Sequence, residues 1–194
     1  MGVAARNVSS PPPRHLETVM ESRAKLVGHS IHKMLIVFPL GLLATAVIFD
    51  IIALATKHPT WFDAAYHMIP AGIIGGLAAA IFGLVDWLGI PGGTRAKRIG
   101  AIHGIGNVVV VVLFALSWYL RRGSPPAPSG GALTFGFLGL LLALVTGWLG
   151  GELADRLGVG VDDGANLDAP SSLSGRPARE VSAGAAGRST AGVR

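Results

Sequence analysis

Four long apolar stretches divide the sequence, and short polar segments separate them. The stretches cover residues 34–56, 68–90, 99–120 and 132–151, and their only charged residues are Asp50 in the first and Asp86 in the second. A helix of about 20 residues is long enough to cross the roughly 30 Å of hydrocarbon in a bilayer. Each stretch is therefore predicted to cross a membrane as an α-helix.

The pattern within the stretches favours helices over the strands of a membrane barrel. Barrel strands alternate apolar and polar residues over segments of about ten residues, whereas residues 108–113 read VVVVVL. The connections, residues 57–67, 91–98 and 121–131, are short, and short connections place consecutive helices side by side in opposite directions. The predicted fold is therefore an all-α integral membrane protein, an antiparallel up-and-down four-helix transmembrane bundle.

Composition supports a membrane protein and limits the available chemistry. Apolar residues make up 51% of the 194 residues and charged residues only 14%, which argues against a water-soluble enzyme. The chain has no cysteine, so histidine and carboxylates are the strong metal ligands that it can offer. The sequence carries no hydrolase signature, and we expect no catalytic activity of its own.

Basic residues are distributed unevenly between the two sides of the predicted bundle. Of the 16 Lys and Arg residues, 13 lie in residues 1–33, 91–98 and 152–194, and the other three are Lys57, Arg121 and Arg122. Cytoplasmic segments of membrane proteins carry the excess of Lys and Arg. Both termini are therefore predicted to be cytoplasmic. We interpret the basic excess as a signal for orientation and for contact with the lipid bilayer, and not with nucleic acid.

The two ends of the chain differ in composition from the predicted membrane domain, residues 28–161. Residues 1–27 include three consecutive prolines, and residues 162–194 are rich in Gly, Ala, Ser, Pro and Arg. Segments with few large apolar side chains bury too little surface to offset the entropy of ordering. They are predicted to be a disordered cytoplasmic leader and a disordered cytoplasmic tail.

Polar side chains near the predicted cytoplasmic ends of the spans form a candidate site. A charged or polar group inside a span is costly and needs a partner or a function. We call the following set, which all four spans supply, the polar layer: His29, His32, Asp86, His103 and Glu152. A smaller group, Asp50 and His67, is expected near the opposite ends of the spans, where these two side chains could pair.

Spacing favours a ligand role for the histidines. His29 and His32 are three residues apart, and His103 and Asn107 are four apart, so each pair shares one face of a helix. Imidazoles on facing helices of a bundle are typical ligands of a metal or of haem. The spacing therefore predicts a ligand site at the cytoplasmic side.

A local explanation stays open for each residue of the polar layer. Histidines near the membrane interface reach water. Asp86 is expected to lie within reach of Arg95, and Glu152 within reach of Arg98, so each carboxylate has a candidate ion-pair partner. Under this explanation the polar layer only satisfies its own hydrogen bonds and charges.

Several motifs, in this order, resemble the bacterial membrane family known as domain of unknown function 2231. The resemblance covers about residues 28–161 and is carried by residues 28–35 (GHSIHKML), 38–41 (FPLG), Asp50, 83–87 (GLVDW), 90–91 (IP), 93–98 (GTRAKR), His103 with Asn107, and 147–152 (GWLGGE). It implies a four-span domain of a bacterial inner membrane, encoded in some cases beside or fused to redox modules such as Rieske-type proteins. Many members carry a Tyr and a His shortly after the last Glu, where this chain has Asp155 and Leu157.

Three functions are compatible with these residues. The leading hypothesis is an electron-transfer domain that binds haem b, with His103 as one axial ligand, His29 or His32 as the other, and Arg95 and Arg98 at the propionates. Its partner would be a redox protein. The first alternative is a divalent-metal or proton-handling membrane protein that uses the whole polar layer.

The second alternative is a non-catalytic structural membrane subunit that anchors or docks a partner. Pairs of glycines four residues apart, such as Gly72 with Gly76 and Gly100 with Gly104, favour close packing of helices. The helices that pack closely at these glycines belong either to one chain or to the two chains of a homodimer.

Overall fold

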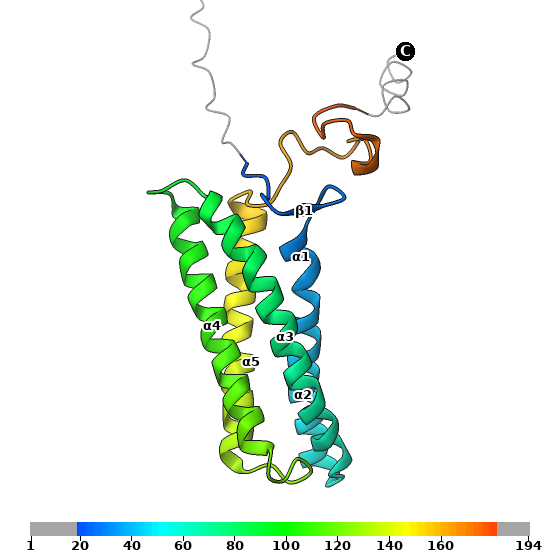
Figure 1. The fold of residues 1–194 in the computed structure, drawn as a ribbon, viewed down its shortest axis with the longest axis vertical. Coiled ribbons are helices and arrows are strands. Elements are labelled where there is room, and N and C mark those ends of the chain that lie inside the picture. The colour runs from blue at the N-terminus through cyan, green and yellow to red at the C-terminus, as the bar shows by residue number, and fades with distance from the viewer. Residues whose placement is uncertain (1–18, 182–194) are drawn as a thin grey trace, which may run out of the picture.

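Long helices form the membrane domain of the computed structural model, which describes residues 19–181 (Figure 1). They are α1 (Ile31–Leu35) followed by α2 (Val37–Thr56), α3 (Thr60–Gly89), α4 (Arg95–Arg121) and α5 (Gly130–Gly151). Among the described residues, four helical segments are long and apolar enough to cross a membrane, with α1 and α2 together counting as one. The predicted all-α membrane class is confirmed, and Figure 1 is consistent with an antiparallel up-and-down bundle.

Polar residues at the helix ends extend the helices beyond the apolar stretches. α3 begins at Thr60 rather than at residue 68, and Asp63 lies in its first turn, where the helix dipole favours a carboxylate. Thr94 caps α4 by accepting a hydrogen bond from the N–H of Lys97, and Ser129 caps α5 in the same way. Because a capped turn needs no apolar side chains, the spans predicted from hydropathy were too short at these ends.

The first membrane helix is interrupted at Ile36, which separates α1 from α2. Pro39 lies in the first turn of α2 and has no N–H to donate to the carbonyl of Leu35. The interruption leaves a short helix, α1, that carries His32.

An apolar core lies between the helices at mid-length. Its buried members come from α2, α3 and α4 and include Leu43, Val47, Ile69, Val110 and Phe114. Many other large apolar side chains are exposed on the outside of the bundle. In a water-soluble protein these would be costly, whereas in a membrane they face lipid.

Close contacts between helices occur at glycines. A Cβ added at Gly72 would lie 2.6 Å from the side chain of Leu43, and one at Gly139 would lie 2.8 Å from Phe114. α2 therefore packs closely on α3, and α4 on α5. Gly104, which the four-residue spacing also selects, has nothing within 4 Å of an added Cβ in the described part of the chain.

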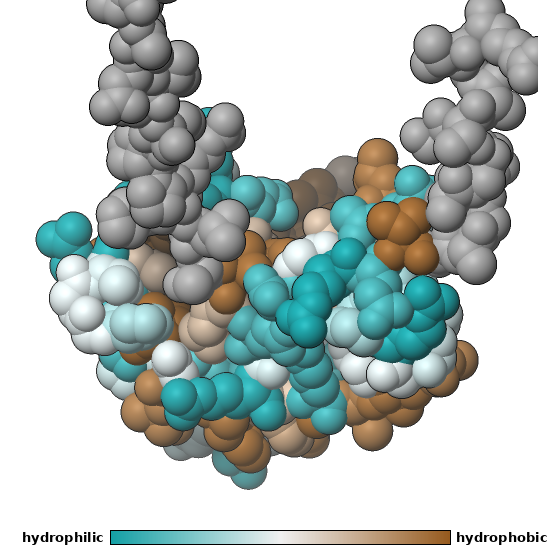
Figure 2. Space-filling view, turned by 90° about the horizontal axis from the view of Figure 1, so that it is seen from above, coloured by the Kyte–Doolittle hydropathy of each residue, from teal (hydrophilic) through white to brown (hydrophobic). Residues whose placement is uncertain are grey.

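One end of the bundle carries additional structure, and we call it the β-hairpin end. Strands β1 (Lys25–Leu26) and β2 (His29–Ser30) pair in antiparallel fashion, and α5 continues into the π-helix η1 (Glu152–Arg156). Residues 162–181 add turns and the 3-10 helix η2 (Ser172–Ser174) beyond this end (Figure 1). Figure 2 looks onto it and shows hydrophilic residues over much of the surface, with hydrophobic residues between them and at the rim. The opposite end, with residues 57–59 and 122–129, is the loop end.

The predicted leader and tail fall only partly within the described residues. Residues 19–27 and 162–181 take part in the β-hairpin, the turns and η2. Residues 1–18 and 182–194 lie outside the described residues. Disorder of residues 1–27 and 162–194 stays a prediction.

Candidate functional site

Two of the predicted histidines, His32 and His103, approach each other inside the β-hairpin half of the bundle. His32 lies on α1 and His103 on α4. Their ring centroids are 6.4 Å apart, and the ring planes are almost perpendicular, at 84°. The structure therefore brings together one imidazole from each half of the chain, as the sequence predicts for a site between helices.

The ring of His32 is held by α3. Its Nδ1 lies 2.9 Å from the carbonyl oxygen of Ala79, and since a carbonyl only accepts, Nδ1 carries the proton. A Cβ added at Gly83, one turn further along α3, would lie 2.9 Å from the same ring. Glycine at this position lets α1 and α3 approach closely enough for the hydrogen bond.

The ring of His103 is held by α5 and by its own helix. Its Nδ1 donates to the carbonyl of Thr146 over 2.8 Å, and its Nε2 lies 3.1 Å from Nδ2 of Asn107. The Thr146 hydroxyl donates to Oδ1 of Asn107 over 3.0 Å. Both ring nitrogens of His103 therefore have a partner, and the three side chains form one network between α4 and α5.

Asp86 binds the segment that precedes the β-hairpin. Its carboxylate accepts from the Ser22 hydroxyl at 2.8 Å, from the Arg23 N–H at 2.7 Å and from the Ala24 N–H at 3.4 Å. The side chain is buried at the end of α3. The local explanation that paired Asp86 with Arg95 is therefore wrong, because backbone amides of the leader segment surround the carboxylate instead.

Glu152 and His29 lie apart from the histidine pair. Arg95 reaches Glu152 over 2.6 Å, so the pairing of Glu152 with Arg98 suggested by the sequence is wrong, and Arg98 is exposed on α4. His29 is exposed in β2, with its Nδ1 3.1 Å from the carbonyl of Val27.

A second polar cluster is buried near the loop end. Arg121 makes two hydrogen bonds of 2.7 and 2.6 Å to the carboxylate of Asp50, and the two side chains are 0% and 2% exposed. Ser117 accepts from Nε of Arg121 at 3.3 Å and donates to the carbonyl of Ala132 at 2.7 Å. The cluster joins α2, α4 and the start of α5.

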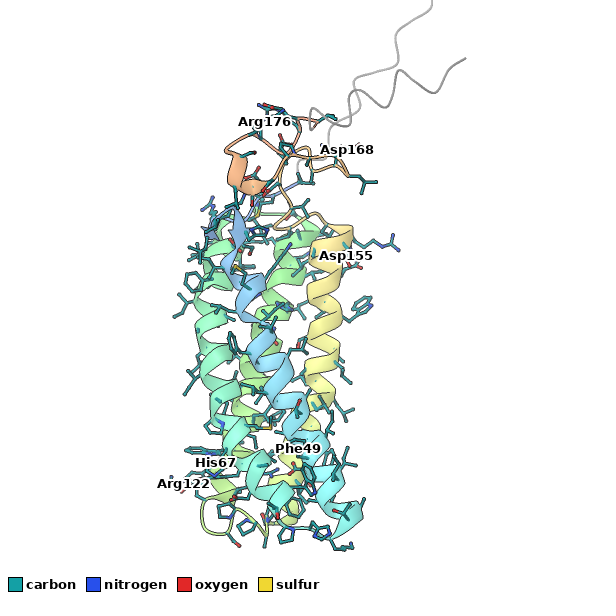
Figure 3. The ribbon with its side chains drawn as sticks, turned by 90° about the vertical axis from the view of Figure 1, so that its right-hand side faces the viewer. Phe49, His67, Arg122, Asp155, Asp168 and Arg176 are labelled. Carbon is teal, nitrogen blue, oxygen red and sulfur yellow. The ribbon has the colours of Figure 1, made fainter. Side chains whose placement is uncertain are left out.

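The expected pairing of Asp50 with His67 is wrong. His67 stacks edge-to-face with Tyr66, with 5.3 Å between ring centroids, and Figure 3 shows it toward the loop end of the bundle. Arg121 has the longer reach and two parallel N–H groups, which match a carboxylate better than an imidazole does.

Comparison with protein-family models agrees with the family resemblance and with a membrane protein. The model described as "Predicted membrane protein (DUF2231)" matches residues 28–163. The chain belongs to this family. Searches of curated proteins and of solved structures gave no match. The match covers α1 to α5 and all of the polar layer, so the network around His103 lies within the DUF2231 domain.

His103 of this DUF2231 member does not fit axial haem ligation in the arrangement described above. An axial ligand needs a free lone pair on a ring nitrogen, but both nitrogens of His103 are engaged. A Cβ at Gly150 would lie 3.2 Å from the His103 ring, so α5 also covers it. Neither His32 nor His103 lines the cavity at the β-hairpin end or the one at the loop end.

The side chains of the polar layer also lie too far apart to bind one metal ion together. Within residues 19–181, no three His, Asp or Glu side chains are placed to hold one. The reason is that each carboxylate is occupied elsewhere, Asp86 by the leader segment and Glu152 by Arg95.

Sequence reasoning missed three participants, Thr146, Ser22 and Arg121. Arg121 follows an apolar stretch directly, and Ser117 precedes it by four residues, so a longer helix would have placed both on one face. Thr146 and Ser22 carry no such signal, because their contacts depend on how distant segments pack.

Proposed function

We propose that this DUF2231 member is a non-catalytic structural subunit of a membrane assembly, in which the polar layer joins the helices to one another. The proposal rests on one observation: the residues of the polar layer bond to different parts of the chain and not to a common ligand site. His32 bonds to α3 and His103 to α5, Glu152 is held by α4, and Asp86 binds the leader segment. Hydrogen bonds between spans hold helices together where lipid removes the hydrophobic drive.

The packing at mid-length supports this proposal over proton handling. A proton path across the bundle needs a succession of polar groups. Between the His103 network and the Asp50–Arg121 pair, the described helices α2 and α4 bury Val47, Val110 and Phe114. This apolar cluster separates the two polar regions.

The same proposal includes a redox protein as the partner of this subunit. The family resemblance implies a redox protein, which a structural subunit would anchor to the bilayer. Electron transfer through haem in this chain would require His103 to give up one of its two hydrogen bonds. Because these polar side chains find their bonding partners within the same chain, the proposal does not require a homodimer.

Replacing His103 by alanine tests the structural role. The variant should lose about 1 kcal/mol of bundle stability, the size of a hydrogen bond between membrane helices, because Asn107 and Thr146 lose their common partner. The measurement is the melting temperature of detergent-purified protein, together with its visible absorption spectrum and elemental analysis. We expect a lower melting temperature and no spectral or metal signal in either protein.

His67→Ala is the matched control, since His67 is an exposed histidine at the loop end. It should leave the melting temperature unchanged. A Soret band in the wild-type protein, or a bound metal that His103→Ala removes and His67→Ala does not, would contradict the structural proposal.

We further propose that the β-hairpin end faces the cytoplasm of a bacterial inner membrane. The excess of Lys and Arg on this side supports the orientation, and the coloured ribbon of the described chain begins and ends on this side (Figure 1). Cysteine labelling can test it, because the chain has no cysteine. A membrane-impermeant reagent applied from the periplasmic side should label Ser124→Cys and spare Ser174→Cys. The reverse pattern would show the opposite orientation.

A further inference from the structure

A cavity of about 520 Å³ lies at the β-hairpin end, outside the histidine network. Its walls come from the β-hairpin, the start of α1 and the segment 160–178. A Cβ added at Gly28 would lie 2.7 Å from Cβ of Ser172, so η2 rests directly on the turn of the β-hairpin. Two parts of the chain that are far apart in sequence thus form the walls of this open cavity.

The cavity is lined by basic side chains among small and apolar residues. Lys25, Lys33 and Arg176 line it together with His29, against one carboxylate, Asp162. Hydrogen bonds to Asp162 and Glu21 raise the pKa of Lys25, so this ammonium is charged at neutral pH. Lys25 is paired with Glu21 and Asp162, and Arg176 with Glu180, so the charge that favours an anion in the cavity is that of Lys33.

Lys33 is the cation best placed to bind an anion. Its Nζ donates to the carbonyl of Gly160 over 2.8 Å, which uses one of its three N–H groups. Within residues 19–181, Lys33 forms no ion pair, whereas Lys25 is bonded to Glu21 and Asp162.

The conformation and the exposure of the β-hairpin turn indicate contact with lipid. Val27 and Gly28 both have positive φ, +52° and +82°, as a two-residue type I′ turn requires. A β-branched residue is strained in this conformation, yet Val27 occupies it with 61% of its surface exposed, beside Leu26 at 54%. In Figure 1 the loop of the β-hairpin extends beyond the outline of the bundle above α1.

The apolar surface continues from the cavity along the first membrane helix. Met34 lines the cavity and is itself 48% exposed, and Val37 and Phe38 follow it with exposed side chains. A molecule with an anionic head and an apolar tail would contact the basic cavity and this surface at once.

We propose that the cavity is a binding site for the phosphate headgroup of an anionic phospholipid, with Leu26 and Val27 inserted in the interfacial region beside it. Lys33 binds the phosphate, Arg176 adds the N–H groups that its ion pair with Glu180 leaves free, and Met34 with Val37 and Phe38 contact the acyl chain. The site fixes the depth of the β-hairpin in the membrane. A soluble phosphate would use the basic side chains alone and leave the apolar turn without a role.

Native mass spectrometry of the full chain in detergent, titrated with phosphatidylglycerol or phosphatidylcholine, tests the proposal. Phosphatidylglycerol should bind more tightly, and the preference should fall as salt is raised. Lys33→Gln should weaken phosphatidylglycerol binding about fivefold, which corresponds to about 1 kcal/mol for one basic residue at an anionic surface. Lys33→Arg should restore it.

Arg98→Gln is the matched control, because it removes one exposed charge at the same end but outside the cavity. It should leave binding unchanged. Val27→Ser should weaken the binding of phosphatidylglycerol. It should not change the extent to which soluble glycerol phosphate competes with the lipid. Equal binding of the two lipids, an equal loss in Lys33→Gln and Arg98→Gln, a salt-independent preference, or full competition by glycerol phosphate would each overturn the proposal. The salt dependence is measured on wild-type protein and does not rely on any variant folding.

Discussion

Replacing Asp50 by alanine is expected to lower the free energy of unfolding by about 3–5 kcal/mol, the cost of leaving a buried charge without its partner. Arg121 is fully buried and makes two hydrogen bonds to Asp50. After the substitution its guanidinium keeps only Ser117 as a partner in this cluster. Denaturant unfolding of the detergent-solubilised protein, followed by circular dichroism, measures the change.

The double variant Asp50→Leu with Arg121→Met is the informative comparison. Replacing both members of a buried pair by apolar residues is often neutral or stabilising, so this protein should be close to wild type in stability. Arg122→Leu, which removes the neighbouring exposed arginine, should have a small effect. A single Asp50→Ala variant as stable as the wild type would show that the pair is not buried in the membrane.

Replacing Asp86 by alanine is expected to release the segment before the β-hairpin. The carboxylate binds the Ser22 hydroxyl and two backbone N–H groups. A hydrogen bond to a charged group contributes about 1.5–3 kcal/mol, so the loss of these bonds should lower local stability by at least that amount. Hydrogen exchange of the Arg23 and Ala24 amides, followed by mass spectrometry, should become faster in the variant.

Asp63→Ala provides the control, because Asp63 is an exposed acidic residue at the other end of α3. It should not change exchange in residues 22–24. Protection of these amides that survives Asp86→Ala would mean that the β-hairpin and the contact between Met20 and Gly158 hold the segment without the carboxylate.

The sequence itself was sufficient for the class of the fold and the family. An apolar stretch that is long enough to cross a bilayer has to satisfy its backbone hydrogen bonds internally, so the existence of four helices follows from length and hydropathy. The same pattern did not determine where the helices begin. Thr60 and Ser129 lie in polar segments, where a helix depends on caps and dipole interactions rather than on lipid.

Only the tertiary structure decided which polar groups are partners. Arg121 meets Asp50 across 71 positions of the chain, and Asp86 meets Ser22 across 64. Such pairs depend on the rotation and relative height of helices, which close contacts at residues such as Gly72 and Gly139 determine. Sequence spacing reports the face that a side chain occupies on its own helix. It carries no information about the neighbouring helix, and for this reason the sequence could group the residues of the polar layer but could not pair them.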